Sequence, residues 1–313
     1  MIKGMREAKR TSDELLEARR FIIEEFAKYK KVGEIVADPQ FVFKISELIR
    51  QLAQDQFALT DPSPLFVNRA SAELGQTLEV EEVVNTMKAV RRHPGSHPLA
   101  FTPSKRKYPV TTAQYDLPFA IDLEKILRRQ LSADVFVDHA AEALSRLYVE
   151  TVLGAVEAAV SGNDHYGRAM TSSVGTAVDA TTLDAALRRM GDINSDVFIA
   201  GRYWALFPIT GFTGYSDVAA EEIRRTGMIG RYKGARLVVL RDDFNFYYNS
   251  GSIADDVIYL GGSEKGAWLH ERDVSALDYQ SIDPEKAWIK NGFRVDFGVT
   301  VLQPWKYHII NIT

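Results

Sequence analysis

Apolar residues recur at helical spacing through the first part of the chain. Residues 12–31 are predicted to form one helix, because acidic residues occupy its first turn and lysines its end, where the helix dipole favours each charge. A second helix follows Asp38, with Pro39 in its first turn. The pattern therefore predicts a helical segment over residues 1–60.

The longest helical pattern lies in the middle of the chain, from Asp134 to Ser161, and Gly162 ends it. About 28 residues at a rise of 1.5 Å each would span roughly 40 Å. Many of its apolar residues are alanines, which allow other elements to approach closely. The sequence therefore predicts a long helix that is closely covered by a sheet or by another helix.

The segment from Leu99 to Pro118 lacks the pattern of a core element. Three prolines interrupt it, and its apolar residues are too scattered to form one face. Ordering such a segment costs roughly 1–2 kcal/mol per residue in backbone entropy, which its own burial cannot offset. It is therefore either a flexible loop or a two-stranded ribbon held by another molecule, and the rarity of long structureless loops favours the ribbon.

The second half of the chain alternates short helices with strands and ends in strands. The sequence predicts a short helix near Asp179, a strand over Ala235–Leu240, and two closing strands separated at Pro304. The stretch "LEVEEVV", which precedes the proline-rich segment, fits a strand or a short helix. The order of elements predicts a mixed α+β fold.

The composition is that of an ordinary globular protein. The 313 residues are enough for two domains or for one domain with long insertions, and no apolar run reaches the length of a membrane span. Because the chain has no cysteine, disulfides, thiolate metal sites and cysteine nucleophiles are excluded. The charged N-terminus does not fit a secretory signal, so we expect a soluble protein made inside the cell.

The net charge of the whole chain is small, but its N-terminal part carries an excess of basic residues. The net charge of −4 gives no overall attraction to nucleic acid. Up to Lys31, however, the chain has nine Lys/Arg and six Asp/Glu. This basic excess fits either a solvated helix face or a surface that faces nucleic acid.

No residue pattern predicts an active site. The chain has no glycine-rich phosphate loop and no nucleophile elbow. His93 and His97 are four residues apart, but Pro94 and Pro98 prevent the helix that would bring them together on a metal. We therefore predict no catalytic residue, no metal site and no cofactor, which favours a structural role.

From His97 to the C-terminus, the order of elements resembles the major capsid proteins of tailed bacteriophages of the Hong Kong 97 type. The segment Leu99–Pro118 resembles the extended loop of that family, and Asp134–Ser161 resembles its spine helix. "SGND" is similar to the turn after that helix, and "GRYKGARLVVLRD" resembles a strand of the axial domain. "WIKNGFRVDFGVTVLQPWKYHIINI" resembles the closing segment. The resemblance implies a Hong Kong 97-type capsid fold.

The resemblance also implies how the chain is divided. Family members often begin with a scaffolding helix that a protease removes; residues 1–56 resemble it, and we expect them to be retained as an enlarged N-terminal arm. The expected parts are an N-terminal helical segment over 1–60, an N-arm over 61–96, the extended loop over 97–118, a peripheral domain over 119–170 with the spine helix over 134–161, an axial domain over 171–263, peripheral strands over 264–303 and a return to the axial domain over 304–313.

A capsid protein of this family assembles with copies of itself. The resemblance implies pentamers and hexamers that form the icosahedral head shell of a tailed bacteriophage and enclose its double-stranded DNA without reading the sequence. Further expected partners are a portal protein and decoration or scaffolding proteins, and no membrane is expected. The protein would be assembled in the cytoplasm of a bacterial host and remain in the virion capsid.

The extended loop is the part that the resemblance implies will lie on a neighbouring subunit. Its basic residues lie in the first third of the stretch Thr102–Pro118, and its tyrosines lie on the predicted strand arms. The residues expected to contact a neighbour are Lys105, Arg106, Lys107, Tyr108 and Tyr115.

Some relatives crosslink a loop lysine to an asparagine of a neighbour, in a reaction that a glutamate promotes. Lys105 or Lys107 would supply the amine here, and Asn291 matches the asparagine. The glutamate position falls on Gly298, and the nearest acid is Asp296. Without a carboxylate to take the lysine proton, we expect the reaction to be slow.

Two other interpretations remain open. An encapsulin, which is a bacterial compartment shell with the same fold, would package a cargo protein instead of a genome. A monomeric α/β enzyme with a long lid would elute from a sizing column at 35.1 kDa, whereas a shell protein would elute as capsomers or larger particles.

Overall fold

The computed structural model describes residues 12–72, 79–84, 104–130, 132, 135–212, 230–240, 253–272, 277–283 and 288–313. The predictions for His93, His97 and residues 97–103 lie outside the described residues. Within the described ranges, helices and strands both form large parts of the molecule, which confirms the mixed α+β fold.

The described helices come mainly from the first two thirds of the chain. They are α1 (Ser12–Ala27), α2 (Val32–Val36), α3 (Pro39–Thr60), α4 (Leu123–Leu127), α5 (Val135–Ala159), α6 (Ala180–Gly191) and α7 (Tyr203–Leu206), with short 3₁₀ helices η1 (Ser63–Leu65), η2 (Phe207–Gly211) and η3 (Pro304–Lys306).

The described strands extend from the middle of the first third to the C-terminus. They are β1 (Val67–Ala72), β2 (Glu79–Val84), β3 (Ser104–Pro109), β4 (Ala113–Asp122), β5 (Thr171–Val174), β6 (Val197–Gly201), β7 (Arg231–Tyr232), β8 (Ala235–Val239), β9 (Val257–Gly262), β10 (Ala267–Arg272), β11 (Leu277–Asp283), β12 (Trp288–Val301) and β13 (His308–Ile312). The stretch "LEVEEVV" is therefore a strand.

The helix predicted over residues 12–31 is shorter in the structure. α1 ends at Ala27, and α2 follows after a turn. The turn places the Tyr29 ring against Phe41 of α3, with ring centroids 4.5 Å apart, and the Tyr29 hydroxyl donates to Asp38 at 2.9 Å. This tertiary contact decides where the helix ends, which local periodicity could not indicate.

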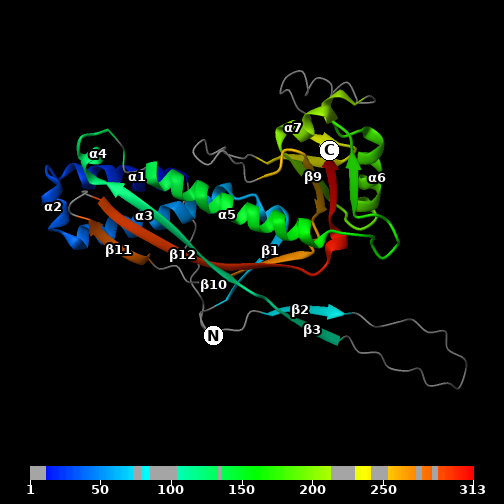
Figure 1. The fold of residues 1–313 in the computed structure, drawn as a ribbon, viewed down its shortest axis with the longest axis horizontal. Helices are drawn as coiled ribbons and strands as arrows, with labels where there is room; N and C mark the ends of the chain where they lie inside the picture. Colours follow the sequence, from blue (N-terminus) through cyan, green and yellow to red (C-terminus); the bar gives the residue numbers. More distant parts are fainter. Residues whose placement is uncertain are drawn as a thin grey trace, which may run out of the picture.

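The main sheet collects strands from distant parts of the chain. Its order is β1-β10-β12-β11, and β4 pairs with β12 on the edge opposite β10 and β11. β4 and β12 are antiparallel and stay paired from Asp122 and Trp288 to Ala113 and Phe297. α5 lies across one face of this sheet (Figure 1).

A second sheet has the order β5-β13-β9-β6-β8-β7. It lies at one end of α5, whereas helices α1–α4 lie at the other end (Figure 1). β9 leads directly into β10, and β12 leads through η3 into β13. The chain also passes from the main sheet through α5 to β5 of the second sheet, and the crossings β9–β10 and β12–β13 together form a junction.

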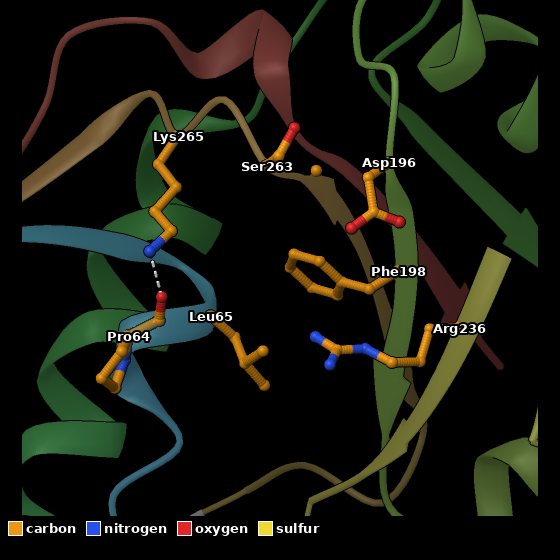
Figure 2. A pocket seen from close by; sticks show the side chains of 8 residues that line it. Pro64, Leu65, Asp196, Phe198, Arg236, Ser263 and Lys265 are labelled. Carbon is orange, nitrogen blue, oxygen red and sulfur yellow. Dashed lines mark hydrogen bonds between the residues drawn. The ribbon is translucent and has the colours of Figure 1, made fainter.

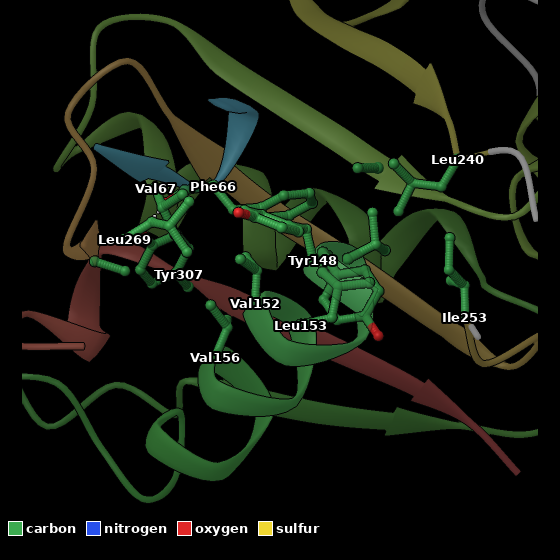
Figure 3. Close-up of a cluster of buried hydrophobic side chains, with 14 of the residues drawn as sticks. Phe66, Val67, Tyr148, Val152, Leu153, Val156, Leu240, Ile253, Leu269 and Tyr307 are labelled. Atoms are coloured by element: carbon green, nitrogen blue, oxygen red, sulfur yellow. Dashed lines mark hydrogen bonds between the residues drawn. The ribbon is translucent and has the colours of Figure 1, made fainter. Parts of the chain in front are cut away.

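α5 is the long helix that the sequence predicts, and it is central to the largest hydrophobic cluster. Its 25 residues correspond to a length of about 38 Å. Val152 and Val156 of α5 lie beside Leu269 of the main sheet and Tyr307 of the junction (Figure 3). The cluster joins α5 to strands of both sheets, so the helix supports the two sheets together.

Helices α1–α3 belong to the core and do not form the expected enlarged N-terminal arm. Ile22, Ile35 and Ile49 are fully buried in a cluster that also contains Ile121 and Ile289 of the main sheet. One apolar side of these helices packs on the body of the subunit, whereas an arm would extend that side to a neighbour.

A polar contact also fixes the N-terminal helices to α5. Arg19 of α1 lies 2.5 Å from the carboxylate of Asp138 in α5, and Gln56 of α3 donates to the same carboxylate at 2.9 Å. Burial would raise the pKa of Asp138, but the bonds from Arg19 and Gln56 lower it. The three helices therefore share one charged contact in addition to their apolar packing.

Replacing Ile49 by alanine should destabilise the whole subunit, because Ile49 is 0% exposed in the cluster that α3 shares with the main sheet. Removing a buried isoleucine side chain in this way costs about 2–5 kcal/mol in the free energy of unfolding. Phe43→Ala on the same helix is the matched control, since Phe43 is 54% exposed. Urea unfolding of the unassembled subunit measures both changes. Equal, small effects would mean that α3 is not part of the core.

Candidate assembly surface

The ribbon formed by β2 and β3 is separate from the main sheet. The two strands are antiparallel and pair only with each other among the described residues. Figure 1 shows the ribbon beyond the main sheet, on the side away from helices α1–α4. Its strands carry opposite charges: β2 has Glu79, Glu81 and Glu82, and β3 has Lys105, Arg106 and Lys107.

Ion pairs across the ribbon neutralise the basic segment within the same chain. Lys105 Nζ lies 2.9 Å from Glu81, and Lys107 Nζ lies 2.8 Å from Glu79 and 3.4 Å from Glu81. Hydrogen bonding to Glu79, and then to Glu81, raises the pKa of Lys107, whereas Lys105 and Lys107 lower the pKa of Glu81. All four side chains stay in contact with solvent, so each pair adds little to stability.

The structure differs from the expectation that residues 97–118 form one projecting ribbon. β3 pairs with β2, whereas Ala113–Asp122 forms β4 and pairs with β12 in the main sheet. Alternate residues of β4, starting at Tyr115, pack against the core. Pro118 fits in β4 because this strand is at the edge of the sheet among the described residues, where no further ladder needs its missing N–H.

Tyr115 is held by its own subunit. The Phe297 ring stacks between Tyr115 of β4 and Tyr148 of α5, with centroid distances of 4.9 Å and 4.1 Å. The other four predicted contact residues, Lys105, Arg106, Lys107 and Tyr108, lie together on β3. The structure therefore brings four of the five predicted contact residues into the ribbon and places the fifth in the core.

The positions expected for a crosslinking reaction do not supply a promoting acid. Asn291 pairs in register with Phe119 of β4, and Asp296 lies five residues further along β12, about 16 Å away. Asp296 is buried. An acidic side chain at Gly298 would collide with the backbone of Thr111. Lys107 is paired with Glu79 and Glu81, and the raised pKa of its amine makes the loss of a proton before nucleophilic attack harder.

Gly298 marks the place where the chain passes over the main sheet between the ribbon and β4. Thr111 and Thr112 lie directly against it, at the position that a Cβ would occupy. Because glycine has no side chain, the backbone can approach this closely. The contact fixes where the ribbon leaves the main sheet.

The two crossings of the junction are bonded to each other. The Gly266 N–H donates to the Tyr307 hydroxyl at 3.0 Å, and this hydroxyl donates to the Phe66 carbonyl at 2.5 Å. The Gly266 carbonyl accepts from the N–H groups of Leu302 and Gln303, both at 3.0 Å. Burial raises the pKa of Tyr307 to about 12, so its hydroxyl remains a donor. These bonds hold the two sheets in a fixed relation.

A small cavity lies beside the junction, between η1 and the second sheet. Figure 2 shows Phe198 and Arg236 of the second sheet on one side of it and Leu65 on the other. Lys265 donates to the carbonyl of Pro64 and to that of Val67, the latter at 3.3 Å. The lysine ties η1 to the crossing, so we interpret the cavity as part of the joint between the sheets.

Asp164 and Arg189 form a buried ion pair at the junction. Arg189 Nε lies 3.1 Å from Asp164, and its other nitrogens donate to the carbonyls of Trp305 and Tyr307, both at 2.8 Å. Burial alone would raise the pKa of Asp164, but main-chain N–H groups of the same turn and the guanidinium groups of Arg168 and Arg189 lower it to about 2. The pair connects the turn after α5 to α6 and to the second crossing.

His308 is buried next to this ion pair. Its Nε2 lies 3.0 Å from the Ser172 hydroxyl, and its Nδ1 lies 3.5 Å from Arg189. Burial, and then the charge of Arg189, lower the pKa of His308 to about 4. Sequence reasoning missed this cluster, because its members are far apart in the chain and an arginine near a helix end usually indicates an exposed residue.

Among the described residues, no three His, Asp or Glu side chains are grouped so that they could hold a metal ion. No helix in the same ranges combines the length and the apolar character needed to cross a bilayer.

Gly298→Ala should displace the backbone at Thr111, because the new Cβ would collide with the Thr111 carbonyl. Overpacking of this kind costs about 1–3 kcal/mol in the free energy of unfolding. Gly154→Ala in α5 is the matched control: a Cβ there meets no atom within 4 Å, and alanine is the better helix former by about 1 kcal/mol. Denaturant unfolding compares the two variants. Equal stability would contradict the close crossing at Gly298.

Stability should fall as the pH drops from 6.5 to 4, because the unfolded chain protonates His308 at its ordinary pKa while the folded chain resists protonation until about pH 4. A shift of this size corresponds to about 3 kcal/mol of lost stability. His308→Gln removes this component, so its free energy of unfolding should change less between pH 7 and pH 4.5 than that of the unmodified protein. His139→Gln, at an exposed histidine of α5, is the control. An unchanged pH dependence in His308→Gln would contradict the prediction.

Comparison with known proteins identifies the family. A family model described as "SPbeta prophage-derived putative capsid protein YonB" matches residues 30–258, well over half of the chain. Among curated proteins, no match was found.

Solved structures from phages and from a GTA particle share the fold at low sequence identity. The asymmetric unit of the bacteriophage PhiM1 mature capsid is 12% identical, with 81% of this chain and 87% of that chain covered and a TM-score of 0.56. Microbacterium phage Oxtober96 is 11% identical, with 81% and 91% covered and a TM-score of 0.52. The capsid of a native GTA particle is 10% identical, with 82% and 90% covered and a TM-score of 0.52.

The solved structures establish the fold, and the family model establishes the family. Two sheets, a long central helix and a separate ribbon agree with a Hong Kong 97-type shell subunit. The chain therefore belongs to the family of the SPbeta prophage-derived capsid protein YonB, and it shares the fold of the bacteriophage PhiM1 mature capsid subunit.

Proposed function

We propose that copies of this chain form pentamers and hexamers that close into an icosahedral shell around double-stranded DNA. The proposal rests on a contrast between two parts of the subunit. In the body, hydrogen bonds of Tyr307 link the two crossings between the sheets, whereas the charged ribbon lies outside this body. A closed shell needs subunits that keep their shape around five-fold and six-fold axes and segments that reach adjacent subunits.

The division of the body into domains follows the two sheets. We assign the main sheet, α1–α4 and α5 to a peripheral domain, and the second sheet with α6 and α7 to an axial domain. The bonds of Tyr307 and Arg189 across the junction support a single rigid wedge, because they leave the two crossings little freedom to bend.

Contacts between subunits are expected to be non-covalent. Each copy in a shell makes many contacts, so modest individual contacts are sufficient for a stable particle. The packing at Gly298 and the protonated Lys107 amine both argue against a crosslink to Asn291.

DNA is expected to contact the inner surface without sequence readout. Phosphate contacts of this kind need only scattered basic residues, and the basic excess up to Lys31 suits an inward position. The proposal also includes a portal protein, scaffolding or decoration proteins, and assembly in the cytoplasm of a bacterial host. The chain itself has a structural role. The capsid family favours this assignment over an encapsulin that would enclose a cargo protein.

Deleting the ribbon should abolish closed shells while leaving the subunit folded. Residues 79–109 are replaced by a short Gly-Ser linker, which can close the gap because Glu79 and Pro109 are paired, with Cα atoms about 5 Å apart. The unmodified chain should form capsomers or particles far larger than the 35.1 kDa monomer, and the deletion variant should remain a folded monomer or an incomplete assembly. Circular dichroism tests folding, and size exclusion with electron microscopy tests assembly. Closed shells from the deletion variant would contradict the proposed role of the ribbon.

A further inference from the structure

The ribbon has one acidic strand and one basic strand, and each has an outer edge with no strand partner among the described residues. Glu79 and Glu81 lie on β2, and Lys105 and Lys107 lie on β3. Alternate residues of a strand share a face. The four side chains therefore form two rows of opposite charge on one face of the ribbon.

The ion pairs inside one ribbon leave these charges only partly satisfied. The exposed fractions of the side chains are 35% for Glu79, 42% for Glu81, 65% for Lys105 and 58% for Lys107. A lysine ammonium has three donors, and a carboxylate accepts several hydrogen bonds. Each row can therefore bind a second row of opposite charge on its outer side without losing its partner in the ribbon.

We propose that ribbons of neighbouring copies pair edge to edge, with β3 of one copy beside β2 of the next. The inference rests on the proposed function of the ribbon as a contact between subunits, and it names the partner surface. The pairing would add main-chain hydrogen bonds of a β-ladder to the charge contacts. The lysines of each β3 would then lie between two rows of glutamates, one from its own copy and one from the neighbour.

The strand directions allow this pairing to repeat. β3 is antiparallel to its own β2, so it is also antiparallel to the β2 of a copy in the same orientation. The contact joins two different edges, which makes it a head-to-tail contact, and such contacts close into rings when the rotation permits. A ring of copies is the arrangement expected of a capsomer.

A second copy fits this surface better than an unrelated partner. An unrelated acidic protein could pair with β3, but it would leave the acidic edge of β2 unused. Only a partner that carries both edges with the same spacing satisfies the two together, and the chain itself is such a partner. Charge complementarity therefore assigns the ribbon of another copy as the occupant.

Two charge-reversed variants test the pairing. Glu79→Lys with Glu81→Lys makes the ribbon basic on both strands, and Lys105→Glu with Lys107→Glu makes it acidic on both strands. Like charges placed side by side disfavour association by several kcal/mol, so each variant alone should yield at least about tenfold less assembled protein. Mixed in equal amounts, the two should assemble together, because a basic ribbon can alternate with an acidic one.

Mixing the two variants distinguishes charge pairing between ribbons of different copies from charge pairing within the ribbon of one copy. Size exclusion and native mass spectrometry should find assemblies with equal numbers of both variants, most readily in hexamers, since a ring of five cannot alternate. The variant with all four substitutions is the control, because it restores opposite charges in every ribbon and should assemble alone. Unfolding of each variant should match the unmodified protein, since the ribbon lies outside the main sheet.

Each contrary result has a distinct meaning. If either two-substitution variant assembles alone, or if the mixture does not recover while the four-substitution control does, edge-to-edge pairing is wrong. If the ribbon deletion itself forms closed shells, the proposed function of the ribbon fails first. If the deletion blocks assembly but the mixture is not rescued, the ribbon contacts another surface of the neighbour and only the edge pairing is wrong.

Discussion

The burial of α5 on two sides is the constraint on which the rest of the subunit depends. The Tyr148 ring stacks on Phe297 of the main sheet, while Asp138 on the same helix binds Arg19 and Gln56 of the N-terminal helices. A helix covered in this way cannot lose either layer without exposing apolar surface. The N-terminal helices, the main sheet and the second sheet are therefore one cooperative body.

Such a body would allow the proposed assembly to depend on a small part of the chain. Tyr307 joins the two crossings, Arg189 joins the turn after α5 to the second crossing, and Gly298 lets the link to the ribbon lie flat on the main sheet. Each of these residues acts by restricting motion. A subunit that cannot bend would present its ribbon at a fixed place, so in the proposed shell a neighbour would meet the same geometry in every copy.

Local patterns predicted the parts of the fold that local forces determine. The long helix was expected over 134–161 and is found at Val135–Ala159. β4 was missed because its alternation, from Tyr115 to Ile121, continues past Pro118, where the proline-rich segment seemed to end. Its partner β12 lies near the other end of the sequence, and no spacing rule connects the two. The acidic partner of the basic segment was likewise missed, because "LEVEEVV" fitted a helix as well as a strand until its pairing with β3 was known.

The neutrality of the ribbon bears on specificity more than on affinity. A purely basic arm would bind any acidic surface, including many proteins of a crowded cell. A ribbon with one acidic and one basic strand has little net attraction at long range, because its charges cancel within a few ångströms. It discriminates only at contact, where strand direction and the spacing of charges must match together. Under the proposed pairing, such a surface would keep unassembled subunits apart from most other proteins and would reserve close pairing for partners that repeat its own pattern.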